Sequence, residues 1–271
     1  MIKIFVDSGS SIKKEERAFY DVEVLPLQIL LNGQEYLDGE NLSMNAFYKA
    51  LLEDKIFPKT SLPLLDDAKR RVNAYVNEGY DVIILTISSG ISGTYNALHM
   101  LFEENPKVRV VDSKTAVGGI KILVREANKY RNETLDFMVE KLNALIPRIK
   151  VLAVPETLDY LRKGRRLSTA GWAVGTLLKI KPIIELKNTV KVASKSLGIK
   201  SAMKHIVSSL EKCDTNYPIV PSYTYDTKNL EELISKTNQE YIAIMTEKDN
   251  LDPAIAAHWG PNAFGYIFVE K

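Results

Sequence analysis

Short apolar runs alternate with amphipathic stretches over the first 147 residues of the chain. Residues 2–6, 82–87 and 108–111 are rich in Val and Ile, as in strands that are buried on both faces of a parallel sheet. Small polar residues follow each run, and apolar positions with helical spacing come next. This alternation of strand, loop and helix predicts a mainly parallel sheet with right-handed crossovers and flanking helices.

The pattern changes after Pro147. The spacing then predicts a strand, two helices and an antiparallel hairpin, at 151–154, 157–163, 170–178 and 182–193. Further helices and strands alternate up to the C-terminus. We therefore predict an α/β protein with two domains, residues 1–147 and 148–271, of which the second is a mixed α/β domain.

Turn and capping residues set the expected limits of several elements. Asn32-Gly33 predicts a hairpin turn, and Ser43 is expected to cap a helix that runs to residue 52. The other local expectations are a helix over 12–20 capped by Ser10 or Ser11, a helix up to about residue 77 capped by Thr60 or Ser61, and a strand at 241–245.

The most distinctive segment is the hydroxyl-rich loop 88–94, which follows a buried strand and precedes a helix. Its glycines, Gly90 and Gly93, let the backbone approach a ligand closely, and its hydroxyls add hydrogen-bond donors. The helix that follows offers unpaired N–H groups and the positive end of its dipole. The loop therefore indicates an anion site. The alternative is that Ser92 or Thr94 only caps the helix.

Composition places the chain among ordinary globular proteins and excludes several classes. Of 271 residues, 45% are hydrophobic and 26% charged, and the net charge of +2 gives no reason to expect nucleic-acid binding. The single cysteine, Cys213, excludes an internal disulfide and a CxxC motif. We see no metal-binding motif, no signal peptide and no apolar run of about 18 residues, so we expect a cytoplasmic protein without a transmembrane segment.

Three kinds of chemistry can be weighed from motifs alone. A serine hydrolase would use Ser92 as nucleophile with His258 as base and an acid such as Asp112, but the sequence lacks the GxSxG spacing of a nucleophile elbow. P-loop and Rossmann signatures are also missing from the sequence. A phosphosugar-binding loop stays open, because Ser/Gly/Thr turns also bind phosphate.

The order of the motifs resembles that of the DegV family of fatty-acid-binding proteins. The resemblance spans essentially the whole chain. It rests on Asp7-Ser8, Asp38-Gly39, Phe47-Tyr48, Thr60-Ser61, Ser88-Ser89-Gly90-Ile91-Ser92-Gly93-Thr94-Tyr95, Val111-Asp112-Ser113, Tyr160-Leu161-Arg162-Lys163-Gly164, Arg166-Leu167-Ser168, Lys181-Pro182-Ile183 and His258-Trp259-Gly260-Pro261.

This resemblance implies a binding subunit of a bacterial fatty acid kinase, with a long-chain fatty acid between two α/β domains and no catalysis or cofactor of its own. It implies that the carboxylate is bound by Thr60, Ser92 and His258, with Ser61, Gly93 and Thr94 nearby in the loops. Arg166 is similar to a residue used with the kinase catalytic subunit. The sequence departs from the family pattern at Leu64, Arg165 and Asn262.

Overall fold

The computed structural model describes residues 1–167 and 180–271. The helix expected at 170–178, together with Ser168 of the resemblance, lies outside these residues. The chain forms two compact units. The first consists of Met1–Pro147 and the short segment Asp252–Ala254, and the second consists of Arg148–Leu251 and Ile255–Lys271.

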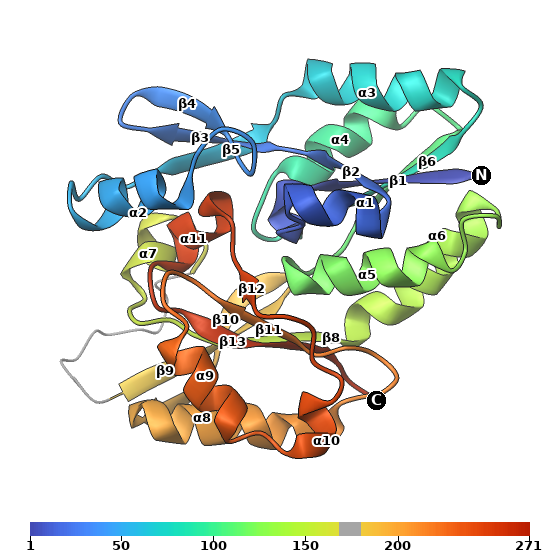
Figure 1. Cartoon of the computed structure of the whole chain (residues 1–271). Helices are drawn as coiled ribbons and strands as arrows, with labels where there is room; N and C mark the ends of the chain where they lie inside the picture. Colours follow the sequence, from blue (N-terminus) through green and yellow to red (C-terminus); the bar gives the residue numbers. More distant parts are fainter. Residues whose placement is uncertain (168–179) are drawn as a thin grey trace. The chain divides into compact units, whose positions relative to one another are not determined.

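The main sheet of the first unit is parallel throughout, as predicted. Its strands lie in the order β2-β1-β6-β7. Helices α3 and α4 cover one face, and helices α5 and α6 cover the other (Figure 1). The bounds of these elements are Ile2–Asp7 (β1), Val22–Leu25 (β2), Asp81–Thr86 (β6), Val108–Asp112 (β7), Leu65–Asn77 (α3), Thr94–Phe102 (α4), Gly118–Asn128 (α5) and Leu135–Leu145 (α6).

The core explains why the strands carry apolar residues on both faces. Residues 82–85 of β6 have no exposed surface, because helices cover both sides of this central strand. Phe5 and Ile84 pack with Val72 of α3 and Leu98 of α4 on one face. Burial of each such side chain contributes about 1.5–3 kcal/mol, so this layer fixes α4 and the loop before it.

A smaller antiparallel sheet with the order β4-β3-β5 belongs to the same unit. Asn32 and Gly33 join β3 to β4 with φ angles of 51° and 76°, as a two-residue hairpin turn requires. Ser43 caps α2, since its side chain accepts a hydrogen bond of 3.2 Å from Ala46 N. The bounds are Leu27–Leu31 (β3), Gln34–Leu37 (β4), Lys59–Pro63 (β5) and Met44–Leu52 (α2).

Two local predictions in this unit are wrong. Residues 12–20 form only a 3₁₀ turn and the short helix α1 (Arg17–Tyr20), because Ser11 adopts a left-handed conformation instead of capping a helix. Thr60 and Ser61 lie in strand β5, where Thr60 pairs with Ile29. Helix α3 begins later, with Leu64 at its N-cap position. Pairing with β3, which is distant in sequence, prevailed over the local capping signal.

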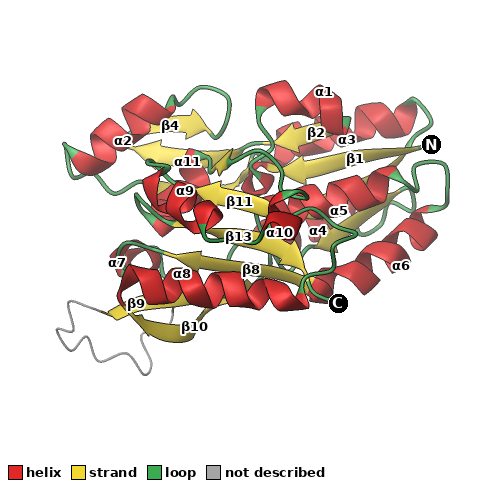
Figure 2. Cartoon of the chain, turned by 60° about the horizontal axis from the view of Figure 1, so that its bottom comes forward, coloured by secondary structure: helices red, strands yellow, loops and turns green. Residues whose placement is uncertain are grey.

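The second unit is α/β, as predicted, and contains a mixed sheet in the order β10-β9-β8-β13-β11-β12. In this sheet β11 and β12 pair in parallel, and the other neighbouring strands pair antiparallel. Helices α8 and α9 cover one face (Figure 2). The bounds are Ile149–Val154 (β8), Ile180–Lys187 (β9), Thr189–Leu197 (β10), Val220–Tyr223 (β11), Asp249–Asn250 (β12), Phe264–Val269 (β13), Asp159–Lys163 (α7), Gly198–Ser209 (α8), Lys228–Ser235 (α9), Gln239–Ile242 (α10) and Pro253–Trp259 (α11).

The strand expected at 241–245 is replaced by helix α10, and Met245 alone forms a bridge, with Ile219. Asn238 adopts an extended conformation just before this helix, and its carbonyl accepts hydrogen bonds from Tyr241 N and Ile242 N. Among the helices of the described residues, none is long and apolar enough to cross a membrane.

The segment Asp252–Ala254 lies with the first unit, whereas the sequence placed all of 148–271 in the second. Asp38 Oδ1 accepts a hydrogen bond of 3.0 Å from Ala254 N, and Asp38 Oδ2 accepts one of 2.7 Å from Ser8 Oγ. Lys13 forms an ion pair with Asp252. Burial, together with the negative charge of Asp252, raises the pKa of Asp38 to about 7, although Ser8, Ala254 and Lys13 oppose the shift.

We predict that Asp38 makes the first unit less stable as the pH rises. An acid with a raised folded pKa holds its proton more tightly in the folded state, so the free energy of unfolding falls between about pH 4 and pH 7. Asp38→Asn keeps the shape and removes this titration. The variant should therefore reduce the fall of the free energy of unfolding with pH by up to about 1.4 kcal/mol per pH unit, as measured by urea unfolding from pH 5 to pH 8.

The exposed Asp54→Asn variant is the control and should keep the wild-type slope. An Asp38→Asn slope equal to that of the wild type would show that the buried carboxyl does not titrate in this range.

Candidate functional site

Three polar loops meet at the carboxyl edge of the parallel sheet. Asp7 ends β1, and its fully buried carboxyl accepts hydrogen bonds from Ile87 N at 2.7 Å and Gly9 N at 2.8 Å. Burial raises the pKa of Asp7 to about 7 although both N–H groups oppose this. The chain passes from β1 to β2 on one side and enters the sheet again at β6 on the other side of β1, so Asp7 lies at the switch point where open α/β sheets bind ligands.

Asp112, at the end of β7, fixes the hydroxyl-rich loop from the other side. Its Oδ1 accepts hydrogen bonds from Ser89 N at 3.0 Å and Lys114 N at 3.1 Å. Burial alone would raise the pKa of Asp112, but the bonds from Lys114 and Ser89 outweigh it and hold this pKa below its ordinary value. Asp112 is thus an ionised acceptor for the backbone of the loop.

The turn itself is organised by Ser88. Its carbonyl accepts hydrogen bonds from Ile91 N and Ser92 N, both at 3.1 Å, and its hydroxyl accepts one from Gly90 N at 3.2 Å. These short-range bonds are typical of Ser at turns. They hold Ser92 at the start of α4.

Ser92 and Thr94 do not act as the cap of α4, because Gly93 occupies the N-cap position. Ser92 Oγ lies 2.9 Å from Thr94 Oγ1 and accepts a bond of 3.3 Å from Thr94 N. Gly93 has no side-chain oxygen for the amides of the first turn. The N-terminus of this nine-residue helix therefore combines a positive dipole end with a pair of hydroxyls, a combination that favours an anion.

The loop packs on strand β5, which carries two further predicted residues. A methyl group at Gly93 would lie 3.4 Å from Leu62 Cδ2, and helix α4 packs against β5. Thr60 is half-buried and Ser61 is exposed on this strand. The first unit thus brings Thr60, Ser61 and the 92–94 loop into neighbouring segments.

The second unit brings His258 and Arg166 together at the end of helix α7. Arg166 Nη1 donates a hydrogen bond of 2.6 Å to the carbonyl of Gly164, and a methyl group at Gly164 would lie 2.2 Å from Nδ1 of His258. Burial, and then the positive charge of Arg166, lowers the pKa of His258 to about 3. His258 is therefore neutral at physiological pH. Burial also lowers the pKa of Arg166 from its usual value.

The turn after His258 is fixed by Thr224. The buried Thr224 Oγ1 donates to the carbonyl of Gly260 at 2.7 Å and accepts from Ala263 N at 2.9 Å. Asn262, one of the departures from the family pattern, donates from its side chain to Glu156 at 2.8 Å. This contact gives Asn262 a structural role in the turn.

Convergence of Thr60, Ser92 and His258 on one carboxylate stays a prediction, since they belong to separate units. Sequence reasoning assigned no role to Asp7 or Gly164 and considered Asp112 only as the acid of a hydrolase, although the motifs of the resemblance contain all three. A buried Asp directly after a strand was the available signal for the first two.

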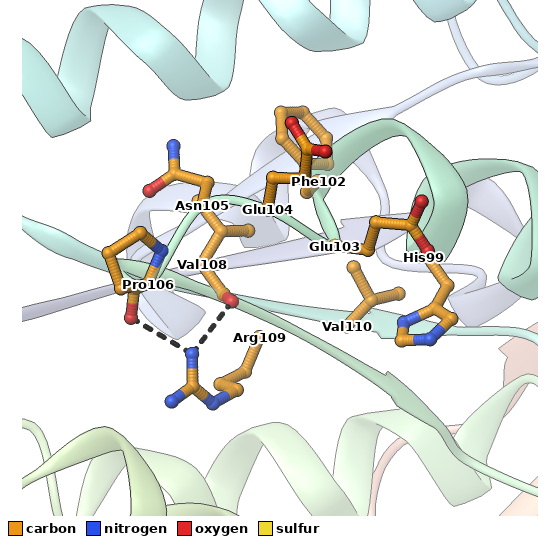
Figure 3. Close-up of a pocket in the computed structure, with 9 residues that line it drawn as sticks. All are labelled: His99, Phe102, Glu103, Glu104, Asn105, Pro106, Val108, Arg109 and Val110. Atoms are coloured by element: carbon orange, nitrogen blue, oxygen red, sulfur yellow. Dashed lines mark hydrogen bonds between the residues drawn. The ribbon is translucent and has the colours of Figure 1, made fainter.

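A pocket of about 440 Å³ lies between the C-terminal end of α4 and the start of β7 (Figure 3). It contains none of the predicted site residues. Its lining includes Glu103 and Glu104, whose carboxylates would repel the head group of a fatty acid, and Arg109 donates to the carbonyls of Pro106 and Val108. This pocket lies at the opposite end of β7 from the polar loops, and we assign no lipid to it.

The fold is α/β, and in the first unit a loop that is held by hydrogen bonds at a helix N-terminus is suited to an anion. The chain belongs to the DegV family, whose family model matches residues 1–271. This confirms the resemblance drawn from the motifs.

Named relatives and solved structures agree with this assignment. A DegV domain-containing protein of Clostridium acetobutylicum is 32% identical over 284 residues, which cover 100% of this chain and 99% of the relative. A DegV family protein from Thermus thermophilus, described for its fatty acid binding, has a TM-score of 0.85 at 28% identity and covers 100% and 99% of the two chains. The Streptococcus pneumoniae fatty acid kinase (Fak) B3 protein, loaded with linoleic acid, has a TM-score of 0.82 with complete coverage of both chains. At 20% identity this last match shows the shared fold alone.

We predict that the imidazole of His258 does not titrate between pH 5 and pH 8. Its folded pKa of about 3 keeps the ring neutral throughout this range. Long-range ¹H–¹⁵N spectra of ¹⁵N-histidine-labelled protein would follow the ring, with the His258→Ala variant identifying its signals. A midpoint near the ordinary value of about 6.5 would contradict burial as the dominant effect.

Proposed function

We propose that this protein binds a long-chain fatty acid and holds its carboxylate with Thr60, Ser92 and His258. The observation that carries the proposal is the loop 88–94, which places Ser92 and the N-terminus of α4, where Gly93 makes no side-chain cap bond, at the switch point of a parallel sheet. Membership of the DegV family and the fatty acid binding of the Thermus relative support the choice of ligand. The proposal includes no cofactor, no nucleic acid and no catalysis by this chain, and a cytoplasmic location stays a prediction.

The energetics divide between the tail and the head group. Burial of about a dozen methylene groups at roughly 0.8 kcal/mol each gives on the order of 10 kcal/mol before ordering costs are subtracted. A hydrogen bond to the charged carboxylate adds about 1.5–3 kcal/mol, offset in part by desolvation. The tail therefore supplies most of the affinity, and the polar residues orient the carboxylate.

The protonation state of His258 fits this division. A neutral imidazole donates one hydrogen bond to a carboxylate without adding a positive charge. The loop hydroxyls and the dipole of α4 act in the same way, as oriented donors without net charge. Such a site binds the carboxylate firmly and still leaves it reactive toward a phosphoryl donor.

We predict that the recombinant protein carries a co-purified fatty acid of about C14–C18, the range that the family resemblance implies, detectable by native mass spectrometry. Ser92→Ala should lower the preference for a fatty acid over the alcohol of equal length by roughly tenfold, because one head-group hydrogen bond is lost. Affinity for the alcohol should change little, since the tail dominates.

Ser89→Ala is the control, because it removes a hydroxyl from the same loop on the side that faces Asp112. A lipid-free protein that hydrolyses a p-nitrophenyl ester, with a rate abolished by Ser92→Ala, would instead establish the hydrolase. Binding of a sugar phosphate but not of a fatty acid would establish the phosphosugar module.

The proposal extends to a partner kinase that phosphorylates the bound carboxylate. Arg166 is half-buried beside His258 and carries a guanidinium group, which can engage phosphate or carboxylate through two parallel hydrogen bonds. We propose that it contacts the kinase or its incoming phosphoryl group. The fold shared with the Fak B3 protein agrees with this role.

For Arg166→Ala we predict at least a tenfold loss of acyl-phosphate formation by the pair reconstituted with a bacterial fatty acid kinase catalytic subunit. The affinity for fatty acid should change less than about threefold, because the tail supplies most of it. Arg165→Ala is the matched control, since Arg165 is adjacent and exposed. A variant that no longer retains lipid would make Arg166 a ligand of the carboxylate, and unchanged phosphorylation would leave it as a structural turn residue.

A further inference from the structure

Two reciprocal contacts join helix α7 to the segment 258–260 within the second unit. In the first contact, the imidazole of His258 packs against Gly164, where an added methyl group would lie 2.2 Å from Nδ1 and 3.0 Å from Cε1. In the second contact, the ring of Tyr160 packs against Gly260, and a methyl group added to Gly260 would lie 2.3 Å from Cδ2 of the ring. Tyr160 and Gly164 are four residues apart, so they share one face of α7.

The backbone of Gly164 does not require glycine. Its φ and ψ angles are −72° and −5°, as the C-cap of α7. Glu78 ends α3 with nearly the same angles, −76° and −2°. Any residue with a Cβ atom could therefore adopt this conformation, and the lack of space beside His258 is the feature that calls for glycine.

The same contact sets the orientation of the imidazole. The Nδ1–Cε1 edge faces Gly164, so Nε2 lies farther from this helix end. A neutral imidazole has one N–H donor and one acceptor nitrogen. Which nitrogen faces a ligand therefore decides whether the ring can donate to it.

We propose that Gly164 is a positioning residue for His258: it holds the Nδ1 edge against α7 and makes Nε2 the atom that meets the lipid head group. This role rests on the proposed fatty-acid function. It adds a residue that touches no ligand itself but determines how a ligand-binding residue is presented.

The test compares Gly164→Ala, His258→Ala and the double variant with the wild type. For each protein, the Kd values of hexadecanoic acid and 1-hexadecanol are measured, and their ratio reports head-group preference. Gly164→Ala and His258→Ala should each lower the preference for the acid by about 10- to 100-fold, with alcohol affinity within about threefold. The double variant should lose no more than His258→Ala alone, because both changes remove the same interaction.

Thermal unfolding separates this role from a general loss of structure. Gly164→Ala should lower the Tm, and His258→Ala introduced into it should restore part of the loss, because the methyl group then occupies vacated space. ¹⁵N spectra of the wild type with bound acid should show a protonated Nε2. Glu78→Ala, at the equivalent backbone position of α3, should leave the acid preference unchanged.

Three outcomes would each overturn the positioning role. A folded Gly164→Ala variant could keep the wild-type preference for the acid, the losses in the double variant could be additive, or Nδ1 could carry the proton with the acid bound. A wild type that binds neither compound would refute the fatty-acid function and this role together. A wild type that prefers the acid, with Gly164→Ala unaffected, would refute the positioning role alone.

Discussion

The buried carboxyl of Asp7 is the constraint on which the site loops depend. Placing a carboxyl group at the end of a central strand without exposure is costly, and the two backbone N–H groups that it accepts offset that cost. In return, the loop after β6 is tied directly to the end of β1. Asp112, at the end of β7, binds the same loop in a similar way, because its carboxylate accepts a hydrogen bond from Ser89 N. The hydroxyl-rich turn is therefore held on two sides by carboxylates that accept hydrogen bonds from its backbone, in addition to the bond that the Ser88 hydroxyl accepts from Gly90 N.

The predicted site residues differ in the charge that they carry. His258 is half-buried near the guanidinium group of Arg166, so protonating it would place two positive charges close together. Ser92 and Thr94 of the first unit are donors that carry no net charge. Arg166 of the second unit carries a full positive charge. A carboxylate bound by neutral donors keeps most of its electron density, which is the property that a nucleophile toward phosphate needs.

The periodicity of hydrophobic residues, together with the turn and capping residues, predicted most of the fold. The buried strands, the Asn32-Gly33 turn and the Ser43 cap are local features, and all three are present. Thr60 was expected as a helix cap, but it lies in a strand that forms through pairing with β3, some thirty residues earlier in the chain. The role of Gly164 was beyond prediction for the same reason: the ring that excludes a side chain there lies more than ninety positions later. The motif resemblance supplied the predicted site residues, which stay a prediction, whereas the contacts that hold their loops became visible only in the structure.

The segment Asp252–Ala254 has a consequence for biosynthesis. It completes the hydrogen bonding of Asp38 and the ion pair of Lys13, both of which lie near the start of the chain. Because a ribosome adds residues in order, the first unit emerges long before these partners do. Until then, Asp38 lacks one of its two donors, and contacts with such large sequence separation form slowly. The final maturation of the first unit is thereby delayed until residues 252–254 have been synthesised, so that a chain truncated before them cannot complete it.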